Sequence, residues 1–375
     1  MAWHDAFNVS YAGLGLSVAL MSGTTAVLQT PVGFLVDRYG AKPLLIGGAL
    51  LMSLAMAAMA TATSFWQILL LTTLAGVGNS VFHPADYAIL SSSIARERIG
   101  RSFAIHHFSG HLGFAVAPPV VAVLALAMGW RSAVLLIGLL GVPVVAAIAL
   151  QSRILTDQTG AQPHGAGEGT VRRPALFTRR MVLFFGFFMF GSMAQSGIQS
   201  WLITVLQTAN AMSLEAASSA LTGYVAGSTA GVLFGGWLSD RLNNRHLLFT
   251  SVLIIVSATL MLTIGLISMP DMTVLALITV AGIAFGASRV SRDIMVKDAA
   301  PPGQIGKVFG FVSAGLPLGQ ALTPVPFGFL IDRGHADLVL IVAAGILLLS
   351  LLCGSGASIR DASRVSRASK LPAQD

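Results

Sequence analysis

The stretch Gly33–Lys42 reads GFLVDRYGAK and lies directly after a long apolar run. A related stretch, Gly236–Arg241 with the sequence GWLSDR, follows 203 positions later and also ends an apolar run. Both copies place a glycine four residues before an Asp-Arg pair. A motif that returns at so long a period indicates two related halves. We therefore expect each half to contain one copy of this motif at the end of an apolar segment.

Composition places both halves in a membrane. Hydrophobic residues make up 55% of the chain and charged residues 10%, with a mean hydropathy of +0.80, whereas a soluble domain carries about 25% charged residues. The net charge is +7, but the basic residues lie in short clusters between apolar runs, so we expect no nucleic-acid partner. The single cysteine, Cys353, excludes a disulfide within the chain. We expect no metal and no cofactor.

Apolar runs of about 20 residues predict an all-α membrane protein with eleven transmembrane helices. The expected spans are 11–35, 43–61, 66–94, 102–127, 131–150, 181–207, 216–238, 247–268, 273–296, 307–331 and 337–357. The first five form an N-terminal half, 1–150, and the last six a C-terminal half, 181–357. A linker, 151–180, joins the halves, and a polar tail, 358–375, follows them.

The distribution of Lys and Arg predicts the orientation. Eighteen of the 22 basic residues fall in one alternate set of loops, in the linker and in the tail, whereas the opposite loops hold only Arg131 and Arg333. Cytoplasmic loops carry the excess of Lys and Arg. We therefore expect a cytoplasmic linker and C-terminus, an external N-terminus, and a location in the plasma (inner) membrane.

Further matches recur at a constant offset of 206 positions. They pair Ala75-Gly76 with Ala281-Gly282, Ile99–Arg101 with Ile305–Lys307, and Phe103, Gly113 and Pro118 with Phe309, Gly319 and Pro324. Two halves in the same orientation imply a pseudo-two-fold axis along the membrane normal. Transporters built in this way bind their substrate between the halves, near the bilayer midplane.

The stretch Gly33–Lys42 resembles the signature loop of the major facilitator superfamily, G-x-L-x-D-R-x-G-x-[RK]. The family carries this loop after its second helix and a weaker copy after its eighth; here the second copy ends Asn243-Asn244-Arg245 and lacks the second glycine. The resemblance covers essentially the whole chain and implies a transporter with two pseudo-symmetric six-helix halves. The run Gly78–Pro84, GNSVFHP, further resembles an element of fosmidomycin-resistance-like exporters.

The resemblance carries two more expectations. Only one predicted span precedes the first signature loop, so the family's first helix is missing, and we expect a misassigned start rather than a true truncation. The family's gating motif, an inter-helix charge network that stabilises the outward-facing state, falls on Gly33, Asp37, Arg38, Gly236, Asp240 and Arg241. For Arg38, a purely topogenic role is the alternative.

Four ionisable residues fall inside predicted spans, where a charge is costly and points to function. His83 and Asp86 lie on the third span, and Arg289 and Arg292 on the ninth. The offset of 206 pairs His83 with Arg289 and Asp86 with Arg292, so the two pairs occupy equivalent places. The spacing i, i+3 puts each pair on one helix face. We expect both faces to line the central cavity.

Two interpretations of these charges remain open. In the first, the arginines bind an anionic substrate, because guanidinium pairs bidentately with carboxylate and phosphonate, and Asp86 exchanges protons. In the second, Arg289 pairs with Asp293 four residues on, and Asp86 neutralises an arginine across the interface. That network would latch the cytoplasmic side without touching substrate.

Other polar side chains in the spans extend the candidate site. His107 and His111 share a helix face that excludes His106, and histidine is the natural proton carrier near neutral pH. Metal binding and ordinary interhelical hydrogen bonding are the alternatives for these two residues. Pairs one turn apart give the remaining substrate-binding candidates, which are Gln195 and Gln199 on the sixth span and Tyr224 and Ser228 on the seventh.

These features predict a proton-coupled secondary transporter, acting alone as a monomer, that exports a small anionic or amphipathic compound by alternating access. An organic-anion importer is one alternative. A non-transporting sensor or partner-binding protein on the same scaffold is another. A membrane enzyme is not expected, because the chain has no nucleophile elbow, P-loop or metalloprotease motif.

Overall fold

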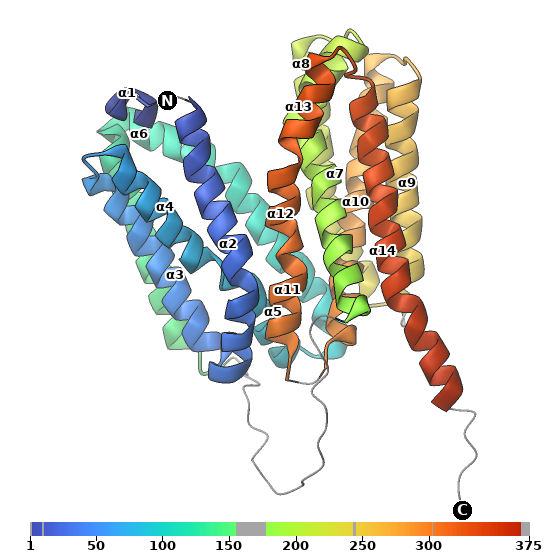
Figure 1. Cartoon of the computed structure of the whole chain (residues 1–375), viewed down its shortest axis with the longest axis horizontal. Helices are drawn as coiled ribbons and strands as arrows, with labels where there is room; N and C mark the ends of the chain where they lie inside the picture. Colours follow the sequence, from blue (N-terminus) through green and yellow to red (C-terminus); the bar gives the residue numbers. More distant parts are fainter. Residues whose placement is uncertain (1, 10, 155–177, 243–244, 302, 369–375) are drawn as a thin grey trace, which may run out of the picture. The chain divides into compact units, whose positions relative to one another are not determined.

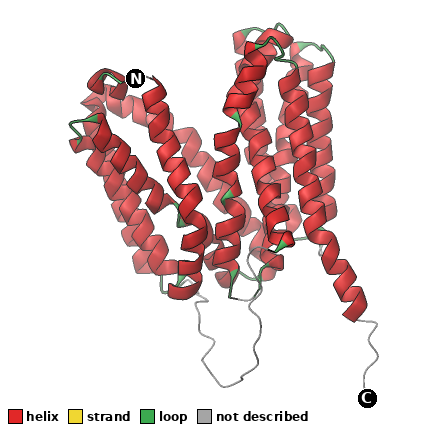
Figure 2. Cartoon of the chain, viewed as in Figure 1, coloured by secondary structure: helices red, strands yellow, loops and turns green. Residues whose placement is uncertain are grey.

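The computed structural model describes residues 2–9, 11–154, 178–242, 245–301 and 303–368, and in this part of the chain all regular structure is helical (Figure 2). Nine of the described helices or helix pairs are long and apolar enough to cross a membrane. The two other predicted spans are helical too: 102–127 lies in α6 (Ile99–Gln151) and 216–238 is α8 (Leu214–Ser239). The first of these carries three histidines and the second many glycine and hydroxyl residues, which makes both less apolar.

Two compact units are present, and each contains segments from distant parts of the sequence. The first comprises 1–95, 106–173 and 300–321, and the second comprises 96–105, 174–299 and 322–375. The predicted division into halves 1–150 and 181–357 stays a prediction. In the compact units, a short segment from each predicted half belongs with helices of the other half.

The first unit is built largely from the N-terminal helices (Figure 1). Its members are α1 (Ala2–Phe7), α2 (Tyr11–Tyr39), α3 (Ala41–Ala58), α4 (Phe65–Asn79), α5 (Phe82–Ser93), most of α6, α11 (Ile305–Ser313) and most of α12 (Gly315–Leu322). Short 3-10 turns lie at Met59–Thr61 and Arg96–Arg98, and the second of these turns belongs to the other unit.

The second unit contains the helices that follow the linker, together with the first turns of α6 (Figure 1). Its helices are α7 (Arg179–Ala209), α8, α9 (His246–Leu266), α10 (Asp271–Ala299), α13 (Pro324–Asp332) and α14 (Leu338–Ala368). Within this unit α10 packs against α8 and α9, and α14 packs against α7 and α9.

Proline and glycine break several predicted spans into shorter helices. Pro84 has no N–H to donate to the carbonyl of Ser80, and the span 66–94 is divided there into α4 and α5. Pro317 likewise cannot donate to Ser313, the residue at which α11 ends. At Gly129 the backbone takes φ 81°, a value open to glycine, and this kink separates the spans predicted at 102–127 and 131–150.

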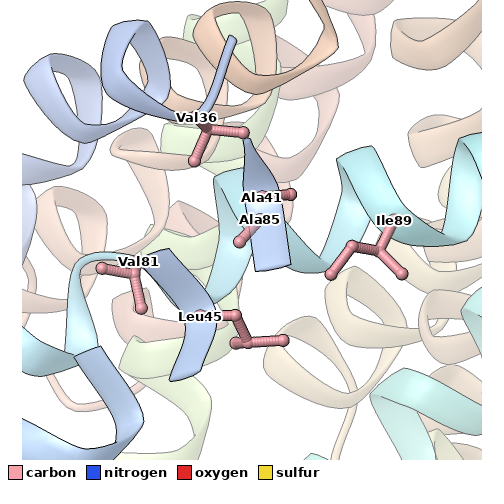
Figure 3. Close-up of a cluster of buried hydrophobic side chains, with 6 residues drawn as sticks. All are labelled: Val36, Ala41, Leu45, Val81, Ala85 and Ile89. Carbon is pink, nitrogen blue, oxygen red and sulfur yellow. The ribbon is translucent and has the colours of Figure 1, made fainter. Parts of the chain in front are cut away.

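Apolar packing joins α2, α3 and α5 in the first unit (Figure 3). The buried cluster consists of Val36, Ala41, Leu45, Val81, Ala85 and Ile89. Two of its six members are alanines, which lets the helix backbones approach closely. Two members, Val36 and Ala41, belong to the signature loop Gly33–Lys42, so the cluster holds this loop against α5.

Glycines bring α8 and α10 of the second unit into backbone contact. A Cβ atom added at Gly227 would lie 2.6 Å from the carbonyl oxygen of Thr279, and one added at Gly231 would lie 2.9 Å from the Cα atom of Ile283. On α10, a Cβ at Gly286 would meet the backbone of Ser228. Small residues at such positions are the usual basis of tight helix association in a bilayer.

This packing predicts the effect of one added methyl group. Gly231→Ala should lower the thermal unfolding midpoint of the purified protein in detergent, because overpacking a tight contact costs about 1–3 kcal/mol. The matched control is Gly345→Ala on α14, where nothing lies within 4 Å of the added Cβ. That variant should be as stable as the parent or up to about 1 kcal/mol more stable, since alanine favours the helix. Equal midpoints for the two variants would contradict the proposed packing.

Candidate functional site

The aspartate of the first signature loop caps a helix far away in the sequence. Its carboxylate accepts a 2.9 Å hydrogen bond from the N–H of Gly306 and a 3.1 Å hydrogen bond from the N–H of Lys307, both in the first turn of α11. Asp37 therefore satisfies amide groups that have no partner inside α11 and places a negative charge at its positive end. Gly33 allows the contact, because a Cβ there would lie 2.9 Å from the Cα atom of Lys307.

The aspartate of the second copy makes the equivalent contacts in the second unit. Asp240 accepts hydrogen bonds from the backbone N–H groups of Gly100, at 2.7 Å, and Arg101, at 3.3 Å, in the first turn of α6. It also forms an ion pair with the side chain of Arg101 at 2.8 Å. A Cβ at Gly236 would lie 2.8 Å from the carbonyl oxygen of Gly100. The two caps thus repeat the offset that pairs Gly100 with Gly306 in the sequence.

The arginines of the two loops lie on the exposed side. Arg38 is exposed, with its guanidinium carbon 5.1 Å from the ring centre of Tyr39. Arg241 lies over the ring of Trp237 at 3.7 Å. The gating network that the sequence predicts stays a prediction, and within it the described contacts belong mainly to the aspartates.

A cluster of ring side chains surrounds Tyr87 in the first unit. The Tyr87 hydroxyl lies 3.2 Å from Nε2 of His107, and its ring is stacked on Phe309 of α11 with 4.0 Å between the ring centres and 5° between the planes. His106 meets the Tyr87 ring edge-on at 5.7 Å, and His83 is stacked on it at 6.2 Å. We call these five residues, together with Asp86, the Tyr87 cluster.

Asp86 and His106 form the acidic and basic pair of this cluster. The distance from Oδ2 of Asp86 to Nδ1 of His106 is 3.8 Å, and the side chains are 17% and 27% exposed. A carboxylate and an imidazole at this distance form an ion pair when the histidine is protonated. His106, which helical spacing alone separated from the other histidines, therefore belongs with them. His111 lies one turn beyond His107 and is half-buried.

The arginines of the second unit lie on the buried part of α10. Arg292 donates from Nε and from its terminal nitrogen to one carboxylate oxygen of Asp293, at 3.1 and 3.0 Å, and its guanidinium lies 3.8 Å above the ring of Phe188. The side chains of Arg292 and Asp293 are 5% and 0% exposed. Arg289 is also buried, three residues earlier. The ion pair expected between Arg289 and Asp293 stays a prediction, and the contact described for Asp293 is the one with Arg292, its neighbour in the sequence.

Polar residues of α7 and α8 complete the second unit's candidates. Tyr224 and Ser228 are fully buried one turn apart on α8, and neither hydroxyl has a hydrogen-bond partner among the described residues. On α7, Gln195 is half-buried and Gln199 is exposed.

The structure thus gathers the predicted candidates into two groups, one in each unit. His83, Asp86 and His107 join the Tyr87 cluster, whereas Arg289 and Arg292 lie in the second unit with Tyr224. Tyr87, Phe309, Phe188 and the inclusion of His106 were not predicted. Among the described residues, no group of three or more His, Cys, Asp or Glu side chains could hold a metal ion.

Titratable and cationic groups buried in membrane spans mark substrate pathways, ion pathways and proton relays, as they do in transporters. The family model of the Major Facilitator Superfamily matches residues 1–217 and 192–373. The chain therefore belongs to this family, as its signature loops predicted, and it is a multi-pass membrane transporter rather than an enzyme.

Two curated relatives and one solved structure illustrate the similarity. The chain is 27% identical over 256 residues to the probable L-galactonate transporter of Escherichia coli (strain K12). This match covers 64% of the chain and 55% of that protein, so the chain spans about half the length of this relative. It is 25% identical over 364 residues to the fosmidomycin resistance protein of the same strain, covering 92% and 84%. The E. coli fucose:proton symporter FucP matches with a TM-score of 0.74 at 14% identity, covering 95% and 92%, which shows the shared fold.

The two aspartate caps predict a specific loss of stability. Asp37→Ala and Asp240→Ala should each lower the free energy of unfolding by about 0.5–2 kcal/mol, the usual cost of losing a helix cap. The measurement is the thermal unfolding midpoint in detergent, with the exposed Asp332→Ala as the control. Midpoints that match this control would show that neither aspartate holds its helix.

Proposed function

We propose that this protein exports a small organic anion in exchange for protons, by alternating access of one site to the two sides of the membrane. Secondary transport follows from the family. The anionic substrate, the coupling to protons and the outward direction are the proposal.

The charge balance on α10 supports an anionic substrate. Its buried part carries two arginines, Arg289 and Arg292, and one carboxylate, Asp293, so it contributes one more positive than negative charge. A buried charge is costly unless another charge compensates it. An acid group of the substrate would add a further acceptor for these guanidinium groups, each of which carries five N–H donors. The likeness to an L-galactonate transporter points to the same class of compound.

The contact between Asp86 and His106 carries the proposal of proton coupling. A carboxylate and an imidazole 3.8 Å apart can hold zero, one or two protons, and the bound number changes with the charge nearby. Histidine titrates near neutral pH. His107 and the hydroxyl of Tyr87, 3.2 Å apart, extend the same cluster by one hydrogen bond. Such a group can load protons in one state of the transporter and release them in another.

The direction of transport rests on the relatives. The similarity to the fosmidomycin resistance protein favours export. Uptake of an organic acid is the second candidate, because the other relative is named as a transporter of a sugar acid, L-galactonate, and its name does not refer to drug resistance. A pH gradient separates the two: antiport releases acid from a vesicle when protons enter, whereas symport takes acid up.

The test is flux of radiolabelled L-galactonate and of fosmidomycin in proteoliposomes containing the full chain. With an acidic exterior, we expect release of preloaded compound. Asp86→Asn should abolish the dependence on the pH gradient and keep exchange of labelled for unlabelled compound, because the site that carries protons is lost while the anion site remains. His106→Gln should weaken the dependence.

Asp271→Asn, at the exposed start of α10, is the control and should behave as the parent protein. Flux through Asp86→Asn that still follows the pH gradient would refute the proton site. Accumulation of external acid by the parent protein would reverse the proposed direction.

A further inference from the structure

We infer that the acid group of the substrate is held in the second unit by the hydroxyls of Tyr224 and Ser228 together with the guanidinium of Arg289, and that Arg292 is a positioning residue that does not bind it. This inference rests on the proposed function and divides the work between two arginines that the sequence treats alike.

The two hydroxyls are the first observation. Tyr224 is 0% and Ser228 2% exposed, and each hydroxyl lacks a hydrogen-bond partner among the described residues. Leaving a buried hydroxyl unpaired is unfavourable, and most native proteins avoid it. Two such groups one turn apart on α8 are therefore more easily explained by a ligand than by the fold.

The packing of α8 against α10 explains why the hydroxyls stay buried. The backbone of Tyr224 lies against Gly282, and the backbone of Ser228 lies against Gly286. Because these glycines have no side chains, the two helices are in contact at both positions. The backbone of α8 at Tyr224 and Ser228 is thereby held against α10, and Gly286 lies three residues before Arg289.

Arg289 supplies the positive charge at this place. It lies one turn after Gly286 on α10, the glycine against which the backbone of Ser228 packs. Hydroxyls and a guanidinium are all donors, whereas carboxylate, sulfonate and phosphonate groups are acceptors only. A compact oxyanion can accept from all three, and hydrogen bonds to a charged group are the stronger ones.

Arg292 is engaged elsewhere. Two of its nitrogens donate to Asp293, and its planar face is covered by Phe188 at 3.8 Å. Its charge is thus matched by a neighbour that is itself 0% exposed. Removing Arg292 would leave the carboxylate of Asp293 buried without that partner, so its main contribution is to the stability of α10.

The experiment removes each hydroxyl in turn and measures two quantities: the unfolding midpoint of the protein and its affinity for the acid. Tyr224→Phe and Ser228→Ala each remove a buried group that has no partner, so the unfolding midpoint of the ligand-free protein should stay the same or rise. Binding of L-galactonate and of fosmidomycin to purified full-length protein should weaken about tenfold or more for each variant, since each loses a hydrogen bond to a charged group. The uncharged sugar L-galactose should bind poorly to all forms.

A matched control is available on α9. Thr250 is also fully buried with an unpartnered hydroxyl, but it is not on α8 or α10. Thr250→Val should leave the affinity for both acids unchanged. Arg289→Lys should reduce the affinity, because lysine loses the planar double donor, whereas Arg292→Lys should lower the unfolding midpoint and leave the affinity of the folded protein unchanged.

Unchanged affinity in Tyr224→Phe and Ser228→Ala would overturn the inference. So would a large fall of the ligand-free unfolding midpoint in those variants, because it would show that the hydroxyls serve the fold. If the parent protein transports L-galactonate but the hydroxyl variants bind it normally, only this inference fails. If the parent protein neither binds nor transports either acid, the proposed function fails and this inference fails with it.

Discussion

The low dielectric of the bilayer requires every buried charge to be compensated inside the protein, and this constraint accounts for most of the polar contacts described above. Asp37 and Asp240 are compensated by backbone amides at the first turns of α11 and α6. Arg292 is compensated by Asp293 and by the face of Phe188. The two aspartates thus require helix ends from distant segments, whereas the charge that compensates Arg292 comes from its neighbour in the sequence.

Close helix approach makes that compensation possible. Gly33 and Gly236 each lie one turn before a capping aspartate, and both carry the backbone of their helix onto the helix being capped. The same device packs α8 against α10 at Tyr224 and Ser228, whose hydroxyls are buried. Glycine packing thus satisfies the amides of helix ends, and in the proposed site it also positions the helix that carries the donor hydroxyls.

The sequence predicted the family, the all-α fold and the helical character of all eleven spans, because apolar runs and a repeated motif are visible without coordinates. It missed the partners of Asp37, since Gly306 lies 269 positions away. It excluded His106 because helical spacing on one helix cannot show that α5 brings Asp86 to it. Tyr87 was not singled out, and Phe309 was noted only as the repeat match of Phe103. The contact between Arg292 and Asp293 joins adjacent positions that do not normally face each other on a helix.

The proposed transport of an organic anion depends on an acid-binding site in the second unit, formed by donors from α8 and α10. A structure of the full chain determined with bound L-galactonate tests it most directly. The account predicts the carboxylate within hydrogen-bond distance of the hydroxyls of Tyr224 and Ser228 and of the guanidinium of Arg289, with Arg292 still paired to Asp293. A ligand bound elsewhere, with these three donors unoccupied, would contradict it.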